Sequence, residues 1–346
     1  MKTTKIVLLI TAFLVVGFLT TACDNSLNNG KYDYLVLVNK YSQLPDDWEK
    51  NVDLVKTKNI WKEDIKVEKQ ALENYKELKA DVEKDLKKYN TTIELDSTYR
   101  SVKEQQELWD EWSADPEKGL DYVKKFVAVP GYSEHHTGLA IDICLKKNGK
   151  LIYDNDKMIA EKKIFSKIHA KLADHGFILR YLKGRDKITG YAYEPWHLRY
   201  IGNKDIAKEI MKKDITFEEY LGSVKDLENN HSAAIYRIEK TLQSYFKKIY
   251  GDKITNSRFN VKKIYTKDDA KKKDNLKDIK LNDKDLAFEV EYQLQPADEA
   301  NINELTIPDG KYDNKLGWVV GIQRVGVLKY NSKTKNYTIK NFGTGW

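Results

Sequence analysis

The chain has 346 residues, with 60 Lys and Arg against 53 Asp and Glu, which gives a net charge of +7. This length predicts two globular units, each large enough to bury its own core. The excess positive charge is spread along the chain, which suits an anionic envelope polymer or lipid surface, whereas no motif supports nucleic-acid binding. We therefore expect no nucleic-acid partner.

The first 22 residues have the pattern of an export signal. Lys2 and Lys5 precede a largely apolar run, Ile6–Phe18, that contains no charged residue. That run is too short for a comfortable membrane span of about 20 residues and has the length of a signal-peptide core. The sequence therefore predicts export, and residues 1–22 are expected to be a signal peptide.

The export pattern ends at a cysteine. Leu19-Thr20-Thr21-Ala22-Cys23 resembles a bacterial lipobox, although Thr20 stands where leucine is usual. We predict lipidation at Cys23, a polar tether over 23–31 and an extracytoplasmic protein anchored to the membrane. An ordinary secretory signal with an incidental Cys23 is the alternative. With Cys23 used in this way, Cys144 is left alone and no disulfide can form within the mature chain.

Segment 32–222 predicts a first α+β unit, in which helices flank a small antiparallel sheet. Apolar residues recur every three or four positions over 64–89, which predicts one long amphipathic helix. Asn148-Gly149 predicts a hairpin turn, and Gly176 is placed to close a helix. The expected strands are 34–38, 93–95, 138–145, 151–153, 177–181 and 190–200, and the further helices are 102–112 and 159–173.

Segment 223–346 predicts a second, smaller α+β unit. Its helix is expected over 235–249 and its strands over 286–294, 318–322, 325–328 and 337–339, with an exposed Lys- and Asp-rich loop over 267–284. A long helix followed by curved strands weakly resembles NTF2-like domains, and we expect a spacer or wall-binding role. Trp318 and Trp346 either contact glycan or peptide or belong to the core.

Two clusters carry residues that bind metals. The stretch YSEHHTGLAID, residues 132–142, places His135 and His136 before an apolar strand that contains Asp142. An aspartate in an apolar strand is costly unless it is paired or binds a metal. Glu194-Pro195-Trp196-His197 adds a carboxylate and an imidazole, and its proline prevents a regular central strand. Two histidines, an aspartate and a free glutamate suit a catalytic zinc site. Hydrogen-bonded histidines and a lysine-paired aspartate are the alternative.

These clusters also resemble the motifs of a known family. Ser133–Asp142 is similar to the SxHxxGxAxD signature of the VanY-type D-alanyl-D-alanine carboxypeptidases, which are zinc LAS metallopeptidases, and Glu194–His197 to their ExxH element. The resemblance extends over about residues 33–215, including Ser97–Ser101 and Gly176–Gly202. It implies a hedgehog/D-Ala-D-Ala-peptidase-like fold for the first unit.

The resemblance also implies a zinc cofactor and a role for each motif residue. His135, Asp142 and His197 correspond to the zinc ligands of the family. Glu194 corresponds to the general base, which takes a proton from water and later gives it to the leaving amine. His136 falls on a variable position and is expected at the rim of the pocket. Cys144 is expected to be a buried thiol, with zinc binding as the alternative.

Four further residues fall on family positions that face the substrate. Arg100 matches the family arginine, whose guanidinium can hold a carboxylate or an oxyanion, and a structural salt bridge is the alternative. Gln105, Ser133 and Tyr181 match positions that line the peptide pocket, although each side chain could equally serve packing or capping. Thr98 departs from the family, in which glycine is common at this position.

The expected function is a zinc carboxypeptidase that removes the terminal D-alanine from peptidoglycan stem pentapeptides. The same motifs serve L,D-carboxypeptidases, which act on the tetrapeptide, and ligands and base do not distinguish the two. A zinc-containing binding module without catalysis is a third hypothesis, against which Glu194 argues. We expect a monomer whose partners are stem peptides and, through the lipid, the membrane.

Overall fold

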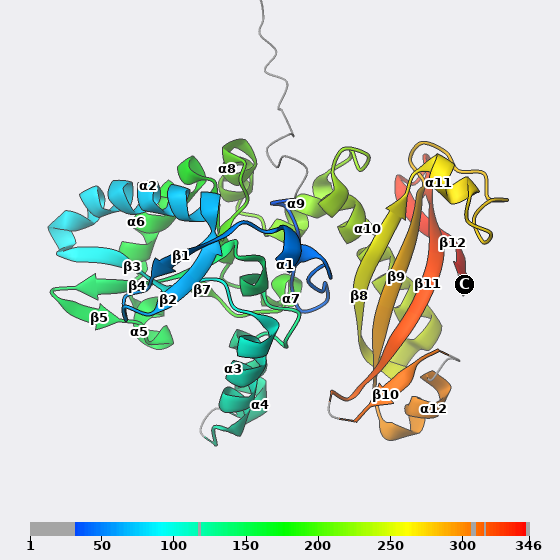
Figure 1. The fold of residues 1–346 in the computed structure, drawn as a ribbon, viewed down its shortest axis with the longest axis horizontal. Coiled ribbons are helices and arrows are strands. Elements are labelled where there is room, and N and C mark those ends of the chain that lie inside the picture. Colours follow the sequence, from blue (N-terminus) through cyan, green and yellow to red (C-terminus); the bar gives the residue numbers. More distant parts are fainter. Residues whose placement is uncertain (1–31, 117–118, 306–308, 315, 344–346) are drawn as a thin grey trace, which may run out of the picture.

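The computed structural model describes residues 32–116, 119–305, 309–314 and 316–343. They form two α+β units, one on the left and one on the right of Figure 1. The predicted α+β class is confirmed. The predicted lipidation site, Cys23, lies outside the described residues. Among the helices of the described ranges, none is long and apolar enough to cross a membrane.

The first unit is built on a five-stranded antiparallel sheet. The strands bond in the order β3-β4-β7-β6, with β5 paired to β4; they are β3 (Thr91–Ser97), β4 (Ala140–Lys147), β5 (Lys150–Ile152), β6 (Phe177–Tyr181) and β7 (Glu194–Tyr200). Helices α2 (Lys69–Leu86) and α6 (Lys162–Leu172) pack against each other and lie on one face of this sheet (Figure 1). Buried aliphatic side chains fill the space between helices and sheet.

Shorter elements complete the first unit. Helices α3 (Val102–Ala114) and α4 (Gly119–Phe126) project together from the bottom of Figure 1, and α4 was not predicted. The remaining elements are α1 (Trp48–Asn51), β1 (Leu54–Lys58), β2 (Asp64–Glu68), α5 (Asn155–Ala160), α7 (Asp186–Thr189), α8 (Lys204–Lys213), α9 (Phe217–Ser223) and the short 3-10 turns Lys87–Tyr89, Glu134–Thr137 and Ala173–His175.

The prediction of a strand over 34–38 is wrong. Leu37 and Val38 are buried, as the apolar run indicated, but the segment is a loop. The carbonyl oxygens of Tyr34 and Val36 each accept a hydrogen bond from Nη2 of Arg199, at 2.8 Å. A buried side chain therefore satisfies the backbone acceptors that a neighbouring strand would otherwise satisfy.

The helix predicted over 64–89 begins five residues later. Residues 64–68 are β2, which pairs with β1 as an antiparallel hairpin that was not predicted. Helix α2 then starts at Lys69, where the Glu68 carboxylate accepts a hydrogen bond from the Ala71 backbone N–H at 2.7 Å. This N-cap fixes the start of the helix, because it satisfies a backbone donor that the first turn leaves free.

The helix predicted over 159–173 is two helices, α5 and α6. The break is at Glu161, whose backbone leaves the helical region. Gly176 closes the second helix and its 3-10 turn with a positive φ of 75°, as predicted. Strand β7 is interior to the sheet, but Pro195 has no pairing partner in either neighbouring ladder. The predicted irregularity at Pro195 is therefore present.

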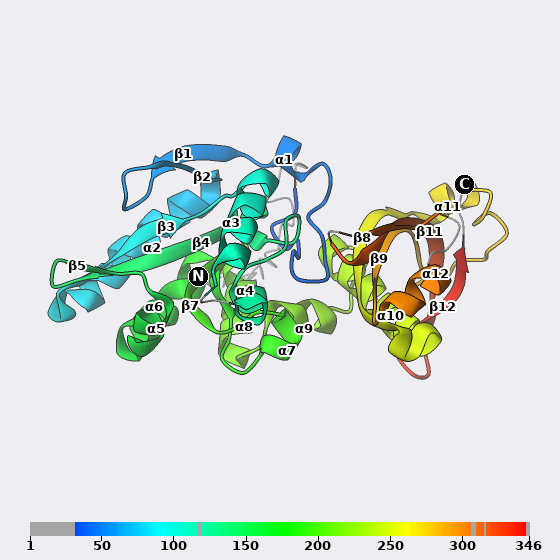
Figure 2. The ribbon, with the colours of Figure 1, turned by 90° about the horizontal axis from the view of Figure 1, so that it is seen from below.

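The second unit is a curved antiparallel sheet wrapped around one long helix. Figure 2 shows the strands curving around α10 (His231–Tyr250). The strands bond in the order β10-β11-β9-β8, with β12 paired to β11; they are β8 (Ile254–Tyr265), β9 (Leu286–Pro296), β10 (Lys311–Asp313), β11 (Trp318–Asn331) and β12 (Asn336–Gly343), with short helices α11 (Lys267–Lys271) and α12 (Ile302–Leu305) and 3-10 turns Gly251–Lys253 and Glu299–Asn301.

Three expectations for the second unit need correction or stay open. The two strands predicted over 318–328 are one strand, β11, whose pairing with β9 shifts near Gly321. The loop over 267–284 is not wholly exposed, since α11 lies in it and Ala270 and Leu276 are buried. The NTF2-like character stays a prediction, and Trp346 lies outside the described residues.

The two units are joined by a shared core and by residues 39–46. Ser42 pairs with Phe259 of β8, and the Phe259 N–H donates to the Tyr41 carbonyl at 2.9 Å. The Ser42 hydroxyl donates to Glu239 of α10 at 2.5 Å. One hydrophobic cluster contains side chains from α8 and α9 as well as α10 and the second sheet. The two units therefore share a core, and the boundary at residue 222 stays a prediction.

Candidate metal centre and active site

Sheet register and one tight turn bring three predicted ligands together. Asp142 of β4 lies opposite His197 of β7 in the antiparallel ladder. His135 lies in the 3-10 turn that precedes β4, and Gly138 ends this turn with φ 72°. A Cβ at Gly138 would lie 2.7 Å from Leu54 Cδ2 and 3.3 Å from the Glu68 backbone nitrogen. The close approach and the positive φ both favour glycine here.

His135, Asp142 and His197 form a compact set of ligand atoms. One ligand atom from each residue lies within 4.8 Å of the others. His135 Nε2 is 3.1 Å from Asp142 Oδ2, and His197 Nδ1 is 3.0 Å from Asp142 Oδ1. The two imidazole rings are nearly perpendicular, at 85°. Among the described residues, this is the group of three whose geometry suits a metal ion.

Hydrogen bonds on the far side of each ring set the ring tautomers. His135 Nδ1 lies 2.6 Å from the Thr98 carbonyl oxygen, and His197 Nε2 lies 3.2 Å from a carboxylate oxygen of Glu134. Because both partners are acceptors, these nitrogens carry the protons. His135 Nε2 and His197 Nδ1 then point lone pairs at Asp142, whose buried Oδ1 has no hydrogen-bond partner. Converging lone pairs fit a bound cation.

The electrostatics of this group also favour a cation. Burial raises the pKa of Asp142, but His135 and His197 outweigh that effect and hold it well below its usual range. Burial lowers the pKa of His135, so this ring is neutral, as a ligand must be. For His197, burial alone would lower the pKa, but Asp142 and Glu134 raise it to about 10, so Nδ1 offers its lone pair to a metal ion only by giving up a proton. The surroundings of His197 therefore stabilise positive charge.

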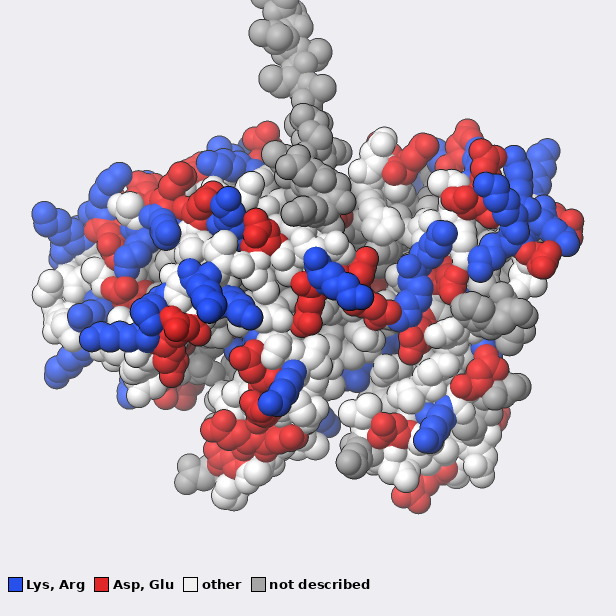
Figure 3. All heavy atoms as spheres, in the orientation of Figure 1, with Lys and Arg blue, Asp and Glu red and all other residues white. Residues whose placement is uncertain are grey.

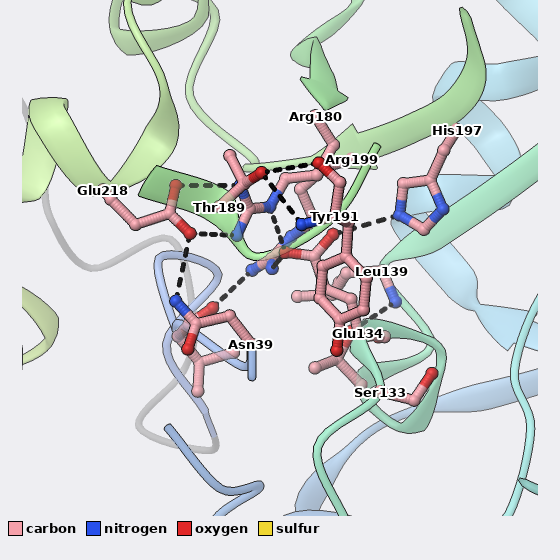
Figure 4. Close-up of polar contacts among 12 residues, drawn as sticks. Asn39, Ser133, Glu134, Leu139, Arg180, Thr189, Tyr191, His197, Arg199 and Glu218 are labelled. Atoms are coloured by element: carbon pink, nitrogen blue, oxygen red, sulfur yellow. Dashed lines mark hydrogen bonds and ion pairs between the residues drawn. The ribbon is translucent and has the colours of Figure 1, made fainter. Parts of the chain in front are cut away.

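Glu134 is a site residue that the sequence prediction missed. Its side chain is fully buried, and Oε1 accepts from Arg180 Nε and Arg199 Nη1, both at 2.7 Å. Arg180 continues to Glu218 of α9 through Nη1 and Nη2, at 2.9 and 2.7 Å. Figure 4 shows this chain of buried charges ending at His197. Glu134 thus orients a ligand imidazole, while two arginines hold Glu134 in place.

Glu194 lies beside the ligands but outside the set of three. Its Oε2 is 3.7 Å from His197 Nδ1, and only 6% of the residue is exposed. Burial raises its pKa to about 8. A carboxyl group with a pKa near neutrality can take a proton and return it, which is what a general base requires. The predicted separation of ligands from free carboxylate is present in the structure.

Arg100 lines the same cavity, and two hydrogen bonds fix its guanidinium. Nη1 donates to Gln105 Oε1 at 2.8 Å, and Nη2 donates to Ser97 Oγ at 3.0 Å. Gln105 is fully buried and donates its own amide to the Ala128 carbonyl at 2.7 Å. Gln105 is not among the residues lining the cavity, so it positions Arg100 instead of lining the pocket as its family position suggested.

The ligands open into a cavity of about 270 Å³. Ser133 and Tyr181 line it, as their family positions suggested, and the Tyr181 ring packs 4.7 Å from the His197 ring. Ser133 also caps the 3-10 turn, since its hydroxyl accepts the His135 N–H at 3.4 Å. The walls combine aromatic and charged side chains; they include Arg100, Trp112, Tyr153, Tyr191, Glu194 and Trp196.

The expectation that His136 lies at the pocket rim is wrong. Its side chain is fully buried, with Nδ1 2.6 Å from the Arg100 carbonyl and Nε2 accepting the Gly131 N–H at 3.0 Å. Burial lowers its pKa to about 4, so it is a neutral structural residue that fixes the Arg100 loop. Cys144 is buried, and burial raises its thiol pKa to about 12, in agreement with an inert thiol.

Comparisons with known proteins place this site within a family. The family model for VanY, D-alanyl-D-alanine carboxypeptidase, matches residues 64–203. A protein of Bacillus subtilis named "Putative carboxypeptidase YodJ" is 37% identical over 197 residues, which cover 56% of this chain and 68% of that protein. The chain belongs to the VanY family. All three candidate ligands and Glu194 lie inside the matched segment.

Other relatives of this VanY-family chain match over shorter or less similar stretches. The bifunctional D-Ala-D-Ala dipeptidase and carboxypeptidase VanXYC of Enterococcus gallinarum is 45% identical over 130 residues, which cover 37% of this chain and 65% of VanXYC. The chain thus spans about two thirds of the length of these curated relatives. A solved structure of the LD-carboxypeptidase LdcB has 36% identity and a TM-score of 0.47, covering 56% of this chain and 87% of that one.

Proposed function

We propose that this chain is a zinc-dependent D-Ala-D-Ala carboxypeptidase that removes the C-terminal D-alanine from peptidoglycan stem pentapeptides. The observation that carries this proposal is the set of two imidazole nitrogens and one carboxylate within 4.8 Å, with Glu194 beside it as a free carboxyl group. Two nitrogen ligands and one carboxylate suit zinc, which keeps a fourth position open in catalytic sites. When bound, zinc supplies a Lewis acid and lowers the pKa of water.

Glu194 is the residue that moves protons in this proposal. Its carboxyl group is buried and its pKa of about 8 lets it change protonation state near neutral pH. Glu194 accepts a proton from the attacking water and returns it to the amine of the departing D-alanine. Because the His135 and His197 far-side nitrogens are held by Thr98 and Glu134, the imidazoles keep their tautomers during this transfer.

Arg100 binds the substrate carboxylate or the developing oxyanion. Its guanidinium is fixed by Gln105 and Ser97, so little side-chain entropy is lost when a ligand binds. The terminal carboxylate of a peptide and a planar guanidinium form paired hydrogen bonds. The positive charge of Arg100 selects peptides with a free C-terminus, which is the property that distinguishes a carboxypeptidase.

The choice of substrate rests on the family and on a relative. The family model is described as a D-alanyl-D-alanine carboxypeptidase, and VanXYC is named for action on D-Ala-D-Ala. A test uses the zinc-loaded protein with separate pentapeptide and tetrapeptide muropeptides, and the products are weighed by mass spectrometry. Loss of one alanine from the pentapeptide alone supports the proposal, while shortening of the tetrapeptide alone would establish the L,D activity instead.

We also propose that the protein is exported and held at the outer side of the membrane by a lipid on Cys23. The support is the sequence pattern of residues 1–23, with two lysines, an apolar run and a lipobox-like end. Detergent phase separation of cell extracts tests the anchor. The wild-type protein should enter the detergent phase and Cys23→Ala the aqueous phase, and equal partition of both would contradict the proposal. A monomer is expected after solubilisation.

A further inference from the structure

A second cavity lies beside the candidate active site, between the two units. Its volume is about 450 Å³, against about 270 Å³ for the cavity at the ligands. Trp109 and Lys124 of the α3–α4 projection line one side, and Arg258 of β8 and Trp318 of β11 line the other. Figure 3 shows a hollow between this projection and the second unit. Tyr191 lines both cavities, so the second begins where the active site ends.

The charge of this second cavity, here called the interdomain pocket, is one-sided. Among the described residues that line it, three are cations, Lys40, Lys124 and Arg258, and none is Asp or Glu. The chain as a whole has 53 acidic residues, almost as many as its 60 basic ones. A lining without acids therefore differs from the mixed surface elsewhere and favours an anionic ligand.

Arg258 is the buried one of these three cations, and it has no anionic partner among the described residues. Only 6% of the residue is exposed, and its guanidinium lies between the rings of Tyr132 and Trp318, at 4.4 and 4.0 Å from their centres. Within the described residues it makes no ion pair, and its buried Nε has no hydrogen-bond partner. The aromatic faces compensate part of the lost hydration, but they supply no acceptor for the N–H groups.

Other buried arginines of this protein have the carboxylate partner that Arg258 lacks. Arg180 and Arg199 both bond to Glu134, and Arg324 bonds to Asp309. A buried guanidinium without such a partner is costly, and an incoming carboxylate with two parallel acceptors would satisfy it. The two aromatic rings in contact with the guanidinium restrict its movement, so less side-chain entropy is lost when a ligand binds.

We propose that the interdomain pocket binds a side carboxylate of the stem peptide, upstream of the bond that is cleaved, with Arg258 as its anchor. The inference rests on the proposed carboxypeptidase function and extends it, because it gives the second unit a role in substrate choice. Stem peptides carry a free α-carboxylate on their γ-linked glutamate unless it is amidated. The pocket thus selects acidic over amidated stems, while Tyr132 and Trp318 supply walls for the peptide chain.

The test first measures binding without catalysis. The full chain is titrated with N-acetylmuramyl-L-alanyl-D-glutamate and, separately, with the α-amide of the same compound, and tryptophan fluorescence is recorded, since Trp109 and Trp318 line the pocket. A charge-assisted pair predicts tighter binding of the acid by roughly 10- to 100-fold. Arg258→Met should abolish this preference and Arg258→Lys should weaken it. Lys248→Met, which removes an exposed charge of α10, should preserve it.

Equal binding of acid and amide to the wild-type protein would overturn the inference without any variant. Binding of glycerol phosphate in preference to the acidic probe would also overturn it, because the pocket would then serve a phosphate polymer. Cleavage separates the two proposals: if pentapeptides with the acid and the amide are both cleaved with equal kcat/KM, this inference fails and the carboxypeptidase proposal stands. If neither pentapeptide is cleaved, the proposed function fails, and the binding ratio still decides the role of Arg258.

Discussion

Replacing Glu134 by glutamine tests whether this buried carboxylate supports both the fold and the metal centre. One carboxylate oxygen accepts two bonds, from Arg180 and Arg199, and the other lies 3.2 Å from His197 Nε2. Glutamine keeps the shape but has a single acceptor oxygen and no charge. The amide N–H₂ group of the glutamine, which cannot accept a hydrogen bond, must then face either the two arginines or His197. In the wild type, the two arginine charges are balanced by Glu134 and Glu218. The substitution removes one of the two negative charges and leaves one buried positive charge uncompensated.

The size of the effect follows from this arrangement. Removing one partner of a buried ion pair costs roughly 3–5 kcal/mol, because the remaining charge stays buried. A group that orients a ligand from outside the ligand set contributes roughly 10- to 100-fold to metal affinity. Glu134→Gln should therefore lower the free energy of unfolding by about 3 kcal/mol or more and weaken zinc binding by at least about tenfold.

Denaturant unfolding and competition with a zinc chelator measure the two effects. Glu228→Gln is the matched control, because this glutamate is exposed and should change neither quantity appreciably. If Glu134→Gln unfolded within about 0.5 kcal/mol of the wild type and bound zinc equally well, Glu134 would not support the site as described. A loss of stability with unchanged zinc affinity would limit its role to the fold.

Three more predictions follow from the structure. Gly138→Ala should destabilise the protein by at least about 1 kcal/mol, since φ is 72° and the new Cβ meets Leu54, and an unchanged melting temperature would contradict this. Burial raises the pKa of Glu239 to about 8, so the protonated carboxyl group contributes its full stability below about pH 4.5, and this contribution is lost as the pH rises through 8. Glu239→Gln should therefore have a higher melting temperature than the wild type at pH 9 and a similar one at pH 5. A constant difference between the two melting temperatures across this pH range would refute the prediction. Zinc at about 1,000 times its Kd should stabilise the wild type by about 4 kcal/mol, and Asp142→Asn should lose most of this gain; equal gains would exclude Asp142 as a ligand.

The metal ligands could be predicted from sequence because the information is local. His135 and Asp142 lie in one short signature, and the alternation of a strand places Asp142 on one face. The far histidine, His197, came from a second short motif. Nothing local indicated Glu134 as a supporting residue, since its partners Arg180 and Arg199 lie 46 and 65 positions along the chain.

The wrong predictions about the fold also concern features that depend on residues distant in the sequence. An apolar β-branched run such as 34–38 predicts burial, but whether it pairs as a strand depends on a distant neighbour, and here Arg199 takes the carbonyls. Residues 64–68 alternate polar and apolar side chains, with Ile65 and Val67 two positions apart, which is the spacing of a strand. The helix predicted over 64–89 included this short alternation, but its pairing with β1 shows that it is a strand. The interdomain pocket could not be predicted, because Tyr132, Arg258 and Trp318 come together only when the two units pack.

Release of D-alanine from a stem pentapeptide, by the wild type and by Glu194→Gln at equal bound zinc, tests the central claim most directly. The wild type should release one D-alanine per peptide, and a chelator should stop it. Glu194→Gln should retain the metal, because Glu194 lies outside the ligand set, and lose activity by at least about 100-fold. Equal rates for the two proteins, or no D-alanine from the zinc-loaded wild type, would contradict the account.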